Sequence, residues 1–435
     1  MSETNNWNMI RDAYIFSLPL VLMNETLLVG TNTEAPTLGK APINQIGHSR
    51  KLATAAFRQV VTPNVDTLYS QIFFDLSSDA LVLHKPAADR YLSFQVMDAW
   101  SDTIAVLGSG ADTQDERTYL LTGPSFQGTV PEGMTRVSIP TAIGWIIGRT
   151  LCFGPDDLEA IYAIQDQMDA RTLSLFESGD VQPQGIYLPE HNGVPFQRVI
   201  EMRPKQYFDT VNALLVPNPA YQEDADVMKN FASIGVGPGL TFDPSVLGEH
   251  AGEEWKKMLK GLSDYLLEKA DQFLIDNGVF RFMGNPISRF GQEYDYRALV
   301  AIGGFGANPV DAAVYMRANT DDAKDQLSGA HSYLLHFDAL PPVREHGFWS
   351  ITAYDEENFL IDNPISRYTI NDRSDFTLNE DGSLDILLQK DAPLEKPGNW
   401  LPSGDTGFHL FLRVYLPEPT VQDGRWNAPS LTRRS

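Results

Sequence analysis

The sequence predicts a mainly β protein with helical segments, in which a helical middle region braces two antiparallel β-sandwich or jelly-roll-like domains. Three observations predict this fold class. Apolar and polar residues alternate with the period of a strand around residues 67–76 and 143–153, and strand-like runs return from 298 to 417. Asp-Gly, Asn-Pro and Pro-Gly turn signals separate the C-terminal runs. Between the two regions, residues 255–273 carry the apolar spacing of an amphipathic helix.

The N-terminal part is expected to hold one helix and one β domain. Large apolar residues recur at helical spacing within residues 1–30, which predicts an amphipathic helix. Residues 31–50 are polar and rich in turn formers, which indicates a loop or an arm. Together with this arm, residues 31–154 form the expected N-terminal β domain.

The rest of the chain divides into three expected parts. Residues 155–297 are a helical and loop-rich connecting region, with one helix that begins near residue 156 and another over 255–273. Residues 298–417 form the C-terminal β-sandwich domain, and residues 418–435 are a tail. No internal repeat has a clear period, although two β domains around a helical middle form a coarse symmetry.

The balance of charge excludes several classes of function. Lys and Arg total 33 against 57 Asp and Glu, a formal net charge of -24. Such a surface repels phosphate backbones and anionic headgroups, so we expect neither nucleic-acid binding nor a membrane-surface role. No membrane span is expected. The single cysteine, Cys152, excludes an internal disulfide. No export signal is evident, which leaves the compartment unknown: cytoplasmic by default, and periplasmic or secreted if a leader has been trimmed.

Six short motifs follow one another in an order that resembles a known pair of bacterial domains. The first four resemble the domain of unknown function numbered 1254, and the last two resemble its usual partner, the domain of unknown function numbered 1214. The resemblance implies a fold and leaves the chemistry open. The motifs are TPNVDTLYS at 62–70, YLSFQVMDAW at 91–100, GRT at 148–150, IGVGPG at 234–239, HGFWSITAYD at 346–355 and LRVYLP at 412–417.

Three charged residues of the N-terminal domain share strand parity with apolar neighbours. They are Asp66, Asp98 and Arg149. An unpaired charge on an apolar face costs several kcal/mol, so we expect Asp98 and Arg149 to lie within charge-pair distance, with a second carboxylate nearby. Two interpretations remain: a buried salt bridge that fixes the fold, or a polar pocket in which Asp66 or Asp98, helped by Tyr69, serves as an acid or base.

Aromatic residues among amides and charges form a second set of candidates. Flat rings beside amides and guanidinium groups suit stacking on sugars, although rings at strand spacing also occur as core or cross-strand partners. Arg413 shares a strand face with Tyr415 and is expected to hold a ligand carboxylate. The expected ligand-binding residues are Asn64, Thr67, Arg149, Trp349, Tyr354, Arg367, Tyr368, Asn399, Trp400 and Arg413.

The histidine pattern argues against a zinc enzyme. There is no His-Glu-x-x-His run and no pair of cysteines, so we expect no metal site and no cofactor. His336 and Asp338 share a strand face and form a weak site candidate, with a structural histidine as the alternative.

The leading functional hypothesis is a protein that binds a small polar, hydroxylated, saccharide-like ligand and forms a homo-oligomer. The rival hypothesis is a carboxylate-driven hydrolase or lyase that uses Asp66 and Asp98. A third hypothesis is an assembly protein without catalysis, whose N-terminal helix and arm at residues 31–50 exchange between subunits. Whether the protein is an enzyme stays open at this point.

Overall fold

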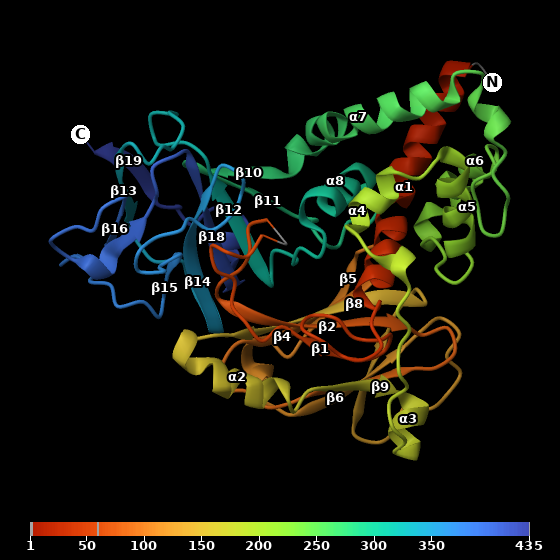
Figure 1. The fold of residues 1–435 in the computed structure, drawn as a ribbon, viewed down its shortest axis with the longest axis horizontal. Coiled ribbons are helices and arrows are strands. Elements are labelled where there is room, and N and C mark those ends of the chain that lie inside the picture. Colours follow the sequence, from red (N-terminus) through yellow and green to blue (C-terminus); the bar gives the residue numbers. More distant parts are fainter. Residues whose placement is uncertain (1–2, 59–60, 435) are drawn as a thin grey trace.

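The computed structural model describes residues 3–58 and 61–434 and, within them, all side chains except those of residues 3–6 and 111. Helices make up 28% of the chain and strands another 28%, in several sheets, so the fold is mixed α/β. The strand-rich domains agree with the sequence-based expectation, but the helical share is larger than a mainly β chain would have. Figure 1 shows the N-terminal β region below, the C-terminal β region to the left and the helices above.

The N-terminal β region consists of two sheets whose inner faces share one apolar core. One sheet has the order β1-β2-β8-β4-β5, and the other has the order β7-β6-β3-β9. Because β9 pairs with β3, this region extends to residue 172. The strands are β1 (Gly47–His48), β2 (Thr67–Asp75), β3 (Leu81–Lys85), β4 (Leu92–Asp98), β5 (Thr103–Leu107), β6 (Arg117–Thr122), β7 (Met134–Ser138), β8 (Ile143–Leu151) and β9 (Asp169–Thr172).

The C-terminal β region also consists of two sheets around one core. Their orders are β10-β11-β12-β18-β14-β15 and β17-β16-β13-β19. The Asp-Gly signal at residues 381 and 382 was predicted as a hairpin turn between strands at 376–378 and 384–388. The turn is present, with Gly382 at a positive φ of 86°, and it leads into β16, but residues 376–378 do not form a strand. The strands are β10 (Leu274–Asn277), β11 (Phe280–Met283), β12 (Ala313–Ala318), β13 (Ser332–Phe337), β14 (Val343–Asp355), β15 (Thr369–Asn371), β16 (Leu384–Gln389), β17 (Trp400–Pro402), β18 (Phe408–Pro417) and β19 (Ser430–Arg434).

The two β regions repeat one topology. Strands β2 to β9 correspond one by one to strands β12 to β19. The order β2-β8-β4-β5 in one sheet is repeated as β12-β18-β14-β15. The order β7-β6-β3-β9 in the other is repeated as β17-β16-β13-β19. Even the exceptional parallel pairs agree, since β6 runs parallel to β7 and β16 runs parallel to β17. The coarse symmetry expected from the sequence is therefore a repeat of the whole strand order, although no clear sequence period announces it.

The helices fill the space beside and above the sheets. Helix α1 stands at the centre of the helical part and packs against α4, α5, α8 and β8 (Figure 1). The predicted helix over 255–273 is present as α7, which ends slightly earlier. The helices are α1 (Glu3–Gly30), α2 (Leu158–Gln165), α3 (Leu173–Ser178), α4 (Pro195–Ile200), α5 (Pro204–Leu214), α6 (Ala225–Ala232), α7 (Ala251–Ala270), α8 (Tyr294–Gly304) and α9 (Pro419–Gln422).

Helix α1 is not the one-faced helix that its spacing predicted. Every residue from 13 to 23 is buried, because α1 is surrounded by helices and by the N-terminal sheet. Among the described residues it is also the one helix long and apolar enough to cross a membrane, by length and composition only. Since 67% of that apolar window is buried inside the chain, α1 has the surroundings of a core helix.

Other differences from the sequence-based expectation lie in the middle region. The helix that begins near residue 156 stops at Gln165, and the chain then forms β9. The segment expected to be loop-rich contains α4, α5 and α6. Residues 298–304, expected to begin the C-terminal strands, belong to α8. These short helices lack a long apolar period, and burial against α1 stabilises them instead.

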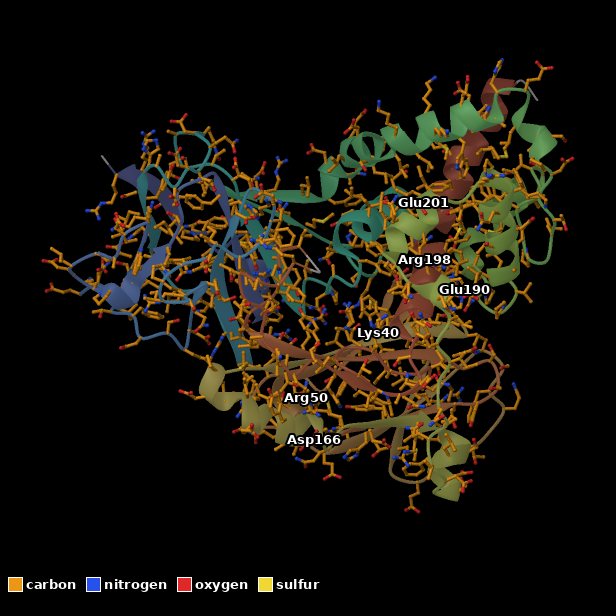
Figure 2. All side chains as sticks on the ribbon, viewed as in Figure 1. Lys40, Arg50, Asp166, Glu190, Arg198 and Glu201 are labelled. Carbon is orange, nitrogen blue, oxygen red and sulfur yellow. The ribbon has the colours of Figure 1, made fainter. Side chains whose placement is uncertain are left out.

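The arm at residues 31–50 packs on its own chain. Arg50 forms an ion pair with Asp166 just after α2 and a hydrogen bond to Gln165 (3.2 Å). Close to the start of the arm, Arg198 of α4 donates to Glu25 of α1 (2.5 Å). Figure 2 shows the two arginines, one beside Asp166 at the N-terminal sheets and one at the helices.

Candidate functional site

The two β regions meet along one polar surface. Here β2, β8 and β4 of the N-terminal region approach β12, β18 and β14 of the C-terminal region, and we call this contact the seam (Figure 1). Its apolar part is a cluster in which Tyr91 and Leu151 pack against Phe348 and Tyr415. The rings of Phe348 and Tyr415 are stacked with centroids 4.3 Å apart.

Asp66 is an ion-pair partner at the seam and has no contact with solvent. Its carboxylate accepts hydrogen bonds from Ser350 Oγ (2.5 Å) and Arg373 Nη2 (3.0 Å), and a longer one from Asn371 Nδ2 (3.4 Å). The side chain of Asp66 is fully buried. All three donors come from the C-terminal region, so Asp66 ties the two regions together. This arrangement supports a structural role for Asp66.

The segment around Asn64 makes further bonds across the seam. Asn64 Oδ1 accepts the backbone N–H of Asp66 (2.6 Å), which fixes a turn, while Asn64 Nδ2 donates to Tyr415 Oη (2.7 Å). Tyr354 Oη donates to the carbonyl of Pro63 (2.8 Å). The TPNVD motif is thus a part of the N-terminal region that binds the C-terminal sheet through hydrogen bonds.

Arg149 lies on the seam face of β8. It is opposite Tyr69 of β2 and Ser93 of β4, so these three side chains form one row across the sheet. The guanidinium donates to Gln95 Oε1 (2.9 Å), Asn308 Oδ1 (3.3 Å) and a backbone carbonyl (3.2 Å). All of these acceptors are neutral. Arg149 therefore has hydrogen bonds, but no carboxylate partner in the described part of the chain.

Arg413 occupies the corresponding place on β18. It is opposite Tyr315 of β12 and Ser350 of β14, which repeats the row of Tyr, Arg and Ser. It donates a hydrogen bond to the carbonyl of Thr62 (3.0 Å), and its guanidinium lies over the ring of Tyr354, 5.5 Å from the centroid. The face that the sequence predicted for Arg413 is correct, but that face is covered by the N-terminal region.

Besides Tyr354, four further phenols lie around the two arginines. The hydroxyl of Tyr91 accepts from Ser93 (2.8 Å), that of Tyr315 from Asn308 (2.7 Å) and that of Tyr415 from Asn64 (2.7 Å). Burial, opposed by the Arg149 charge, raises the pKa of Tyr91 to about 12. Tyr69 is the fourth, with Arg149 5.7 Å from its ring centroid. We name this group the seam cluster: Tyr69, Tyr91, Arg149, Tyr315, Arg413 and Tyr415.

Asp98 is remote from Arg149, and the predicted Asp98–Arg149 pair is wrong. Asp98 is opposite Gly144 in the register of β4 with β8, whereas Arg149 is opposite Ser93, five residues earlier. Because successive side chains alternate between faces, Asp98 and Arg149 lie on opposite faces of the sheet. Both faces of β4 and β8 are apolar and buried, so matching each charge to its own apolar neighbours could not tell the faces apart.

Asp98 instead belongs to a second buried polar group, the acid cluster, with Asp102, Tyr221 and Arg297. Tyr221 Oη donates to Asp98 Oδ2 (2.5 Å), and Arg297 Nη1 lies 3.7 Å from Asp102 Oδ2. Burial and the neighbouring Asp102 raise the pKa of Asp98 to about 7. Burial also raises the pKa of Asp102, against the pull of Arg297.

The aromatic ligand-binding candidates do not form one surface. Trp349 lies in the C-terminal core, and Trp400 is buried with its indole N–H donating to Gln389 (2.9 Å). Arg367 donates to the carbonyl of Trp400 (2.9 Å), and Asn399 donates to the carbonyl of Asp385 (2.7 Å). These residues hold the segment between β15 and β17 together. Because Trp349, Tyr354 and Trp400 are buried, their rings are not available for the predicted stacking on a sugar.

The structure brings the remaining candidates to the seam together with residues that sequence reasoning missed. Asn64, Thr67, Tyr69, Arg149, Tyr354 and Arg413 lie there, and Tyr368 is half-buried elsewhere. Tyr91, Ser93 and Gln95 belong to the family motif at residues 91–100, so membership of that motif could have marked them as candidates. Tyr315, Asn308 and Arg373 carried no signal, because only tertiary contacts bring them to the seam.

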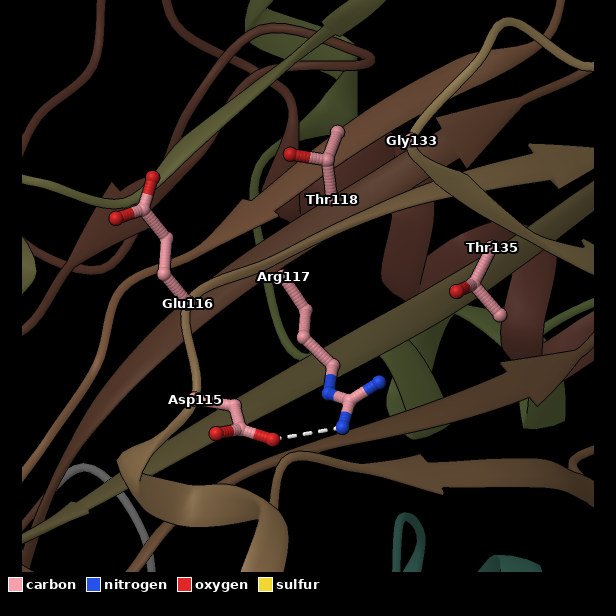
Figure 3. A pocket seen from close by; sticks show the side chains of 6 residues that line it. All are labelled: Asp115, Glu116, Arg117, Thr118, Gly133 and Thr135. Atoms are coloured by element: carbon pink, nitrogen blue, oxygen red, sulfur yellow. Dashed lines mark hydrogen bonds and ion pairs between the residues drawn. The ribbon is translucent and has the colours of Figure 1, made fainter.

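Surface hollows are present away from the seam. One of about 340 Å³ lies at the start of β6 and beside β7, where Arg117 is already paired with Asp115 (2.7 Å; Figure 3). Another of about 450 Å³ lies beside β11 and β12, where it is lined in part by Arg281, Arg317 and Lys324. In the first hollow the cation is neutralised by its own neighbours.

Acidic and histidine side chains gather at one other place. His336 Nδ1 lies 2.6 Å from Asp385 Oδ1, and its Nε2 lies 3.2 Å from Asp338 Oδ1. The hydrogen bond to Asp385 is the main cause that raises the pKa of His336. Within residues 3–58 and 61–434, no group of three or more His, Cys, Asp or Glu side chains is arranged to hold a metal ion.

Fold and seam together define the class: a mixed α/β protein with two β regions of repeated topology and a buried arginine–tyrosine cluster between them. Residues 43–172 match the model of the family described as "Protein of unknown function (DUF1254)", and residues 312–419 match "Protein of unknown function (DUF1214)". The two segments belong to these families, and the resemblance inferred from the motifs is confirmed.

Comparison with solved structures gives a fold relative. The VPA0106 protein from Vibrio parahaemolyticus is 22% identical, with a TM-score of 0.75, and the match covers 99% of this chain and 100% of that one. An uncharacterised protein from Burkholderia cenocepacia is 11% identical with a TM-score of 0.44, over 99% of this chain and 93% of that one. Among curated proteins, nothing matches. The Vibrio relative shares the fold of this chain.

Proposed function

We propose that this protein binds a small polar, hydroxylated ligand of the carbohydrate class at the seam. The observation that carries the proposal concerns three phenols. The hydroxyls of Tyr91, Tyr315 and Tyr415 each accept a hydrogen bond, yet none donates to an acceptor within the described residues. Three O–H donors are therefore free for a ligand rich in oxygen acceptors.

Two further features support binding at this place. Tyr69 and Tyr315 are half-buried, so the seam cluster reaches the molecular surface there. Thr67 shares the strand face of Tyr69, and its Oγ1 is buried without a partner among the described residues, although buried hydroxyls normally have one. We also propose that each β region, with two sheets around one core, is a sandwich-type domain, an architecture that commonly carries carbohydrate sites.

The hydrolase or lyase hypothesis has weaker support. Asp66 is fully buried and its carboxylate is already bonded to Ser350 and Arg373, so it has little freedom to serve as an acid or base. Asp98 has the raised pKa of a general acid, but it lies in the acid cluster on the other face of the sheet and is fully buried. Binding without these carboxylates is the simpler proposal, and self-association stays a prediction.

The proposal is tested by titration calorimetry and thermal shift on the full chain, with D-glucose, D-galactose, D-glucitol and their acid derivatives. A ligand that binds only the folded chain raises the melting temperature as its concentration rises. Tyr315→Phe removes one free donor and is expected to weaken binding about tenfold. The matched control is Tyr333→Phe, whose hydroxyl accepts a backbone N–H (3.1 Å) in the C-terminal region's other sheet. Equal loss in both variants, or no binding by any of these compounds, contradicts the proposal.

A further inference from the structure

The repeated topology places equivalent arginines on opposite sides of the seam. Arg149 is on β8 and Arg413 on β18, which correspond in the two regions. Each arginine has a tyrosine on one neighbouring strand and a serine on the other: Tyr69 with Ser93, and Tyr315 with Ser350. Both rows point to the seam. The seam therefore presents two matching cationic rows to anything bound there.

Neither arginine has the partner that a buried charge requires. Arg149 is 4% exposed and Arg413 is 5% exposed. Each keeps an N–H without an acceptor among the described residues, Nε of Arg149 and Nη1 of Arg413. Burial works to lower the pKa of both guanidinium groups, but the surrounding phenols raise it further, so both stay charged. Two buried, unpaired positive charges are unfavourable until an anion compensates them.

The nearby carboxylate does not supply this compensation. Asp66 influences Arg413, but it is already held by Arg373 (3.0 Å). Around Arg149 the main electrostatic neighbours are phenols and not carboxylates, and burial raises the pKa of two of them, Tyr91 and Tyr415. Arg373 pairs with Asp372 as well, so two carboxylates lie among the three arginines Arg149, Arg373 and Arg413, and the local charge is positive. This excess is local, since the chain as a whole carries a formal net charge of -24.

Both arginines lie close to one phenol. The charges of Arg413 and Arg149 each act to lower the pKa of Tyr415, although burial dominates and raises it. Tyr91 also packs on Tyr415, with ring centroids 5.5 Å apart. A ligand held at the Tyr415 hydroxyl therefore lies within reach of both positive charges. Its polar groups would be oxygen acceptors, because the free groups around it are donors.

From these contacts we infer that the ligand of the seam is a small hydroxylated dicarboxylate, with one carboxylate for each arginine and hydroxyl groups for the tyrosines. The inference rests on the proposed binding function and adds the charge and class of the ligand. A planar carboxylate matches the two parallel N–H groups of a guanidinium, which a lone hydroxyl does not. Two carboxylates neutralise two arginines, and hydroxyls between them accept from the free phenol O–H groups.

The test compares three six-carbon probes that differ only in their ends. D-Glucarate has two carboxylates, D-gluconate has one and D-glucitol has none. Calorimetry on the full chain is expected to give affinities in that order, with a loss of at least tenfold for each carboxylate removed. Equal affinities for the three probes would overturn the dicarboxylate but leave the hydroxylated-ligand proposal standing. Absence of binding by all three would contradict both.

Variants then assign each carboxylate to an arginine. Arg413→Met is expected to lower the affinity for D-glucarate at least tenfold, to that of D-gluconate, and Arg149→Met to do the same. The matched control is Arg317→Met. The guanidinium groups of Arg317 and Arg413 lie 5.8 and 5.3 Å from the centroid of the same Phe411 ring. Arg317 shares a face of β12 with Tyr315, two residues along the strand. Should a Met variant fail to fold, Arg413→Lys and Arg149→Lys keep the charge and lose the planar fork. Unchanged D-glucarate affinity in the arginine variants, or an equal loss in Arg317→Met, contradicts the assignment.

Discussion

The two β regions share a strand order and a row of Tyr, Arg and Ser, yet they differ in what surrounds that row. In the N-terminal region, Arg149 has three neutral acceptors, and Ser93 donates to a tyrosine. In the C-terminal region, Arg413 donates to the carbonyl of Thr62, and Ser350 donates to Asp66 of the other region. Both regions therefore have the row of Tyr, Arg and Ser, but they differ in the hydrogen bonds that this row makes at the seam.

A second pair of equivalent positions, Asp98 and Asp355, also shares one feature and differs in its surroundings. Asp98 ends β4 and Asp355 ends β14. In both, the backbone N–H four residues on donates to the carboxylate, from Asp102 (3.1 Å) and from Phe359 (2.7 Å). In both, the aspartate's own N–H donates back to that residue's carbonyl (3.1 and 2.8 Å). The turn is thus a repeated structural feature, and the N-terminal region adds the acid cluster around Asp98 to it.

The largest expected effect comes from breaking the contact of Asp66 with Ser350 and Arg373, which we call the clamp between the regions. Asp66→Ala removes the buried acceptor of Ser350 and Arg373 and leaves Arg373 with only the partly exposed Asp372, so we expect the free energy of unfolding to fall by about 3 kcal/mol. Denaturant unfolding measures this loss. The control is Asp405→Ala, which removes an exposed carboxylate paired with Lys390 (2.6 Å) and should cost less than about 1 kcal/mol. Similar small losses in both variants would show that the clamp is not needed to join the regions.

The next effect distinguishes Asp98 from its equivalent. Burial and Asp102 raise the pKa of Asp98 from 3.8 to about 7, so folding takes up a proton between these values. Stability from this group is complete below about pH 4 and is lost as pH rises through 7, by a few kcal/mol at about 1.4 kcal/mol per pH unit. Asp98→Asn should remove this fall in pH-dependent unfolding. Asp355→Asn, whose carboxylate pairs with Arg58 (3.4 Å), is the control and should keep the wild-type profile.

A smaller effect compares the two arginines directly. Arg149→Met leaves several acceptors without a donor and Arg413→Met frees one carbonyl, but each change also removes a buried charge that no carboxylate compensates. We therefore expect net costs of at most about 2 kcal/mol for Arg149→Met and about 1 kcal/mol for Arg413→Met. Neither change strands a carboxylate, so both losses should stay below that of Asp66→Ala. Thermal and denaturant unfolding provide the measurement. A loss above about 4 kcal/mol for either variant would indicate a hidden ion pair.

The smallest effects concern the phenols. Tyr315→Phe and Tyr91→Phe each remove a hydroxyl that donates to no acceptor in the described residues, and the hydroxyl's own donor stays behind. We expect losses of about 1 kcal/mol or less in the free energy of unfolding. The same variants should weaken ligand binding clearly. If stability falls strongly while binding is unchanged, the phenols belong to the structure of the seam alone.

Residue patterns alone were enough to predict the general location of the strand-rich regions, the helix now seen as α7, the two family domains and the parity of Arg413 on its strand. Each of these follows from local spacing or from motifs in order. The sequence could not assign Asp98 and Arg149 to faces of the sheet, because both strands are buried on both sides and the register decides which side chains meet. Nor could it show that Asp66 pairs with Arg373, about 300 residues away. Such contacts depend on how two separately formed sheets pack, and no local pattern records that packing. The repeat of Tyr, Arg and Ser likewise became visible only when strand order aligned the two regions.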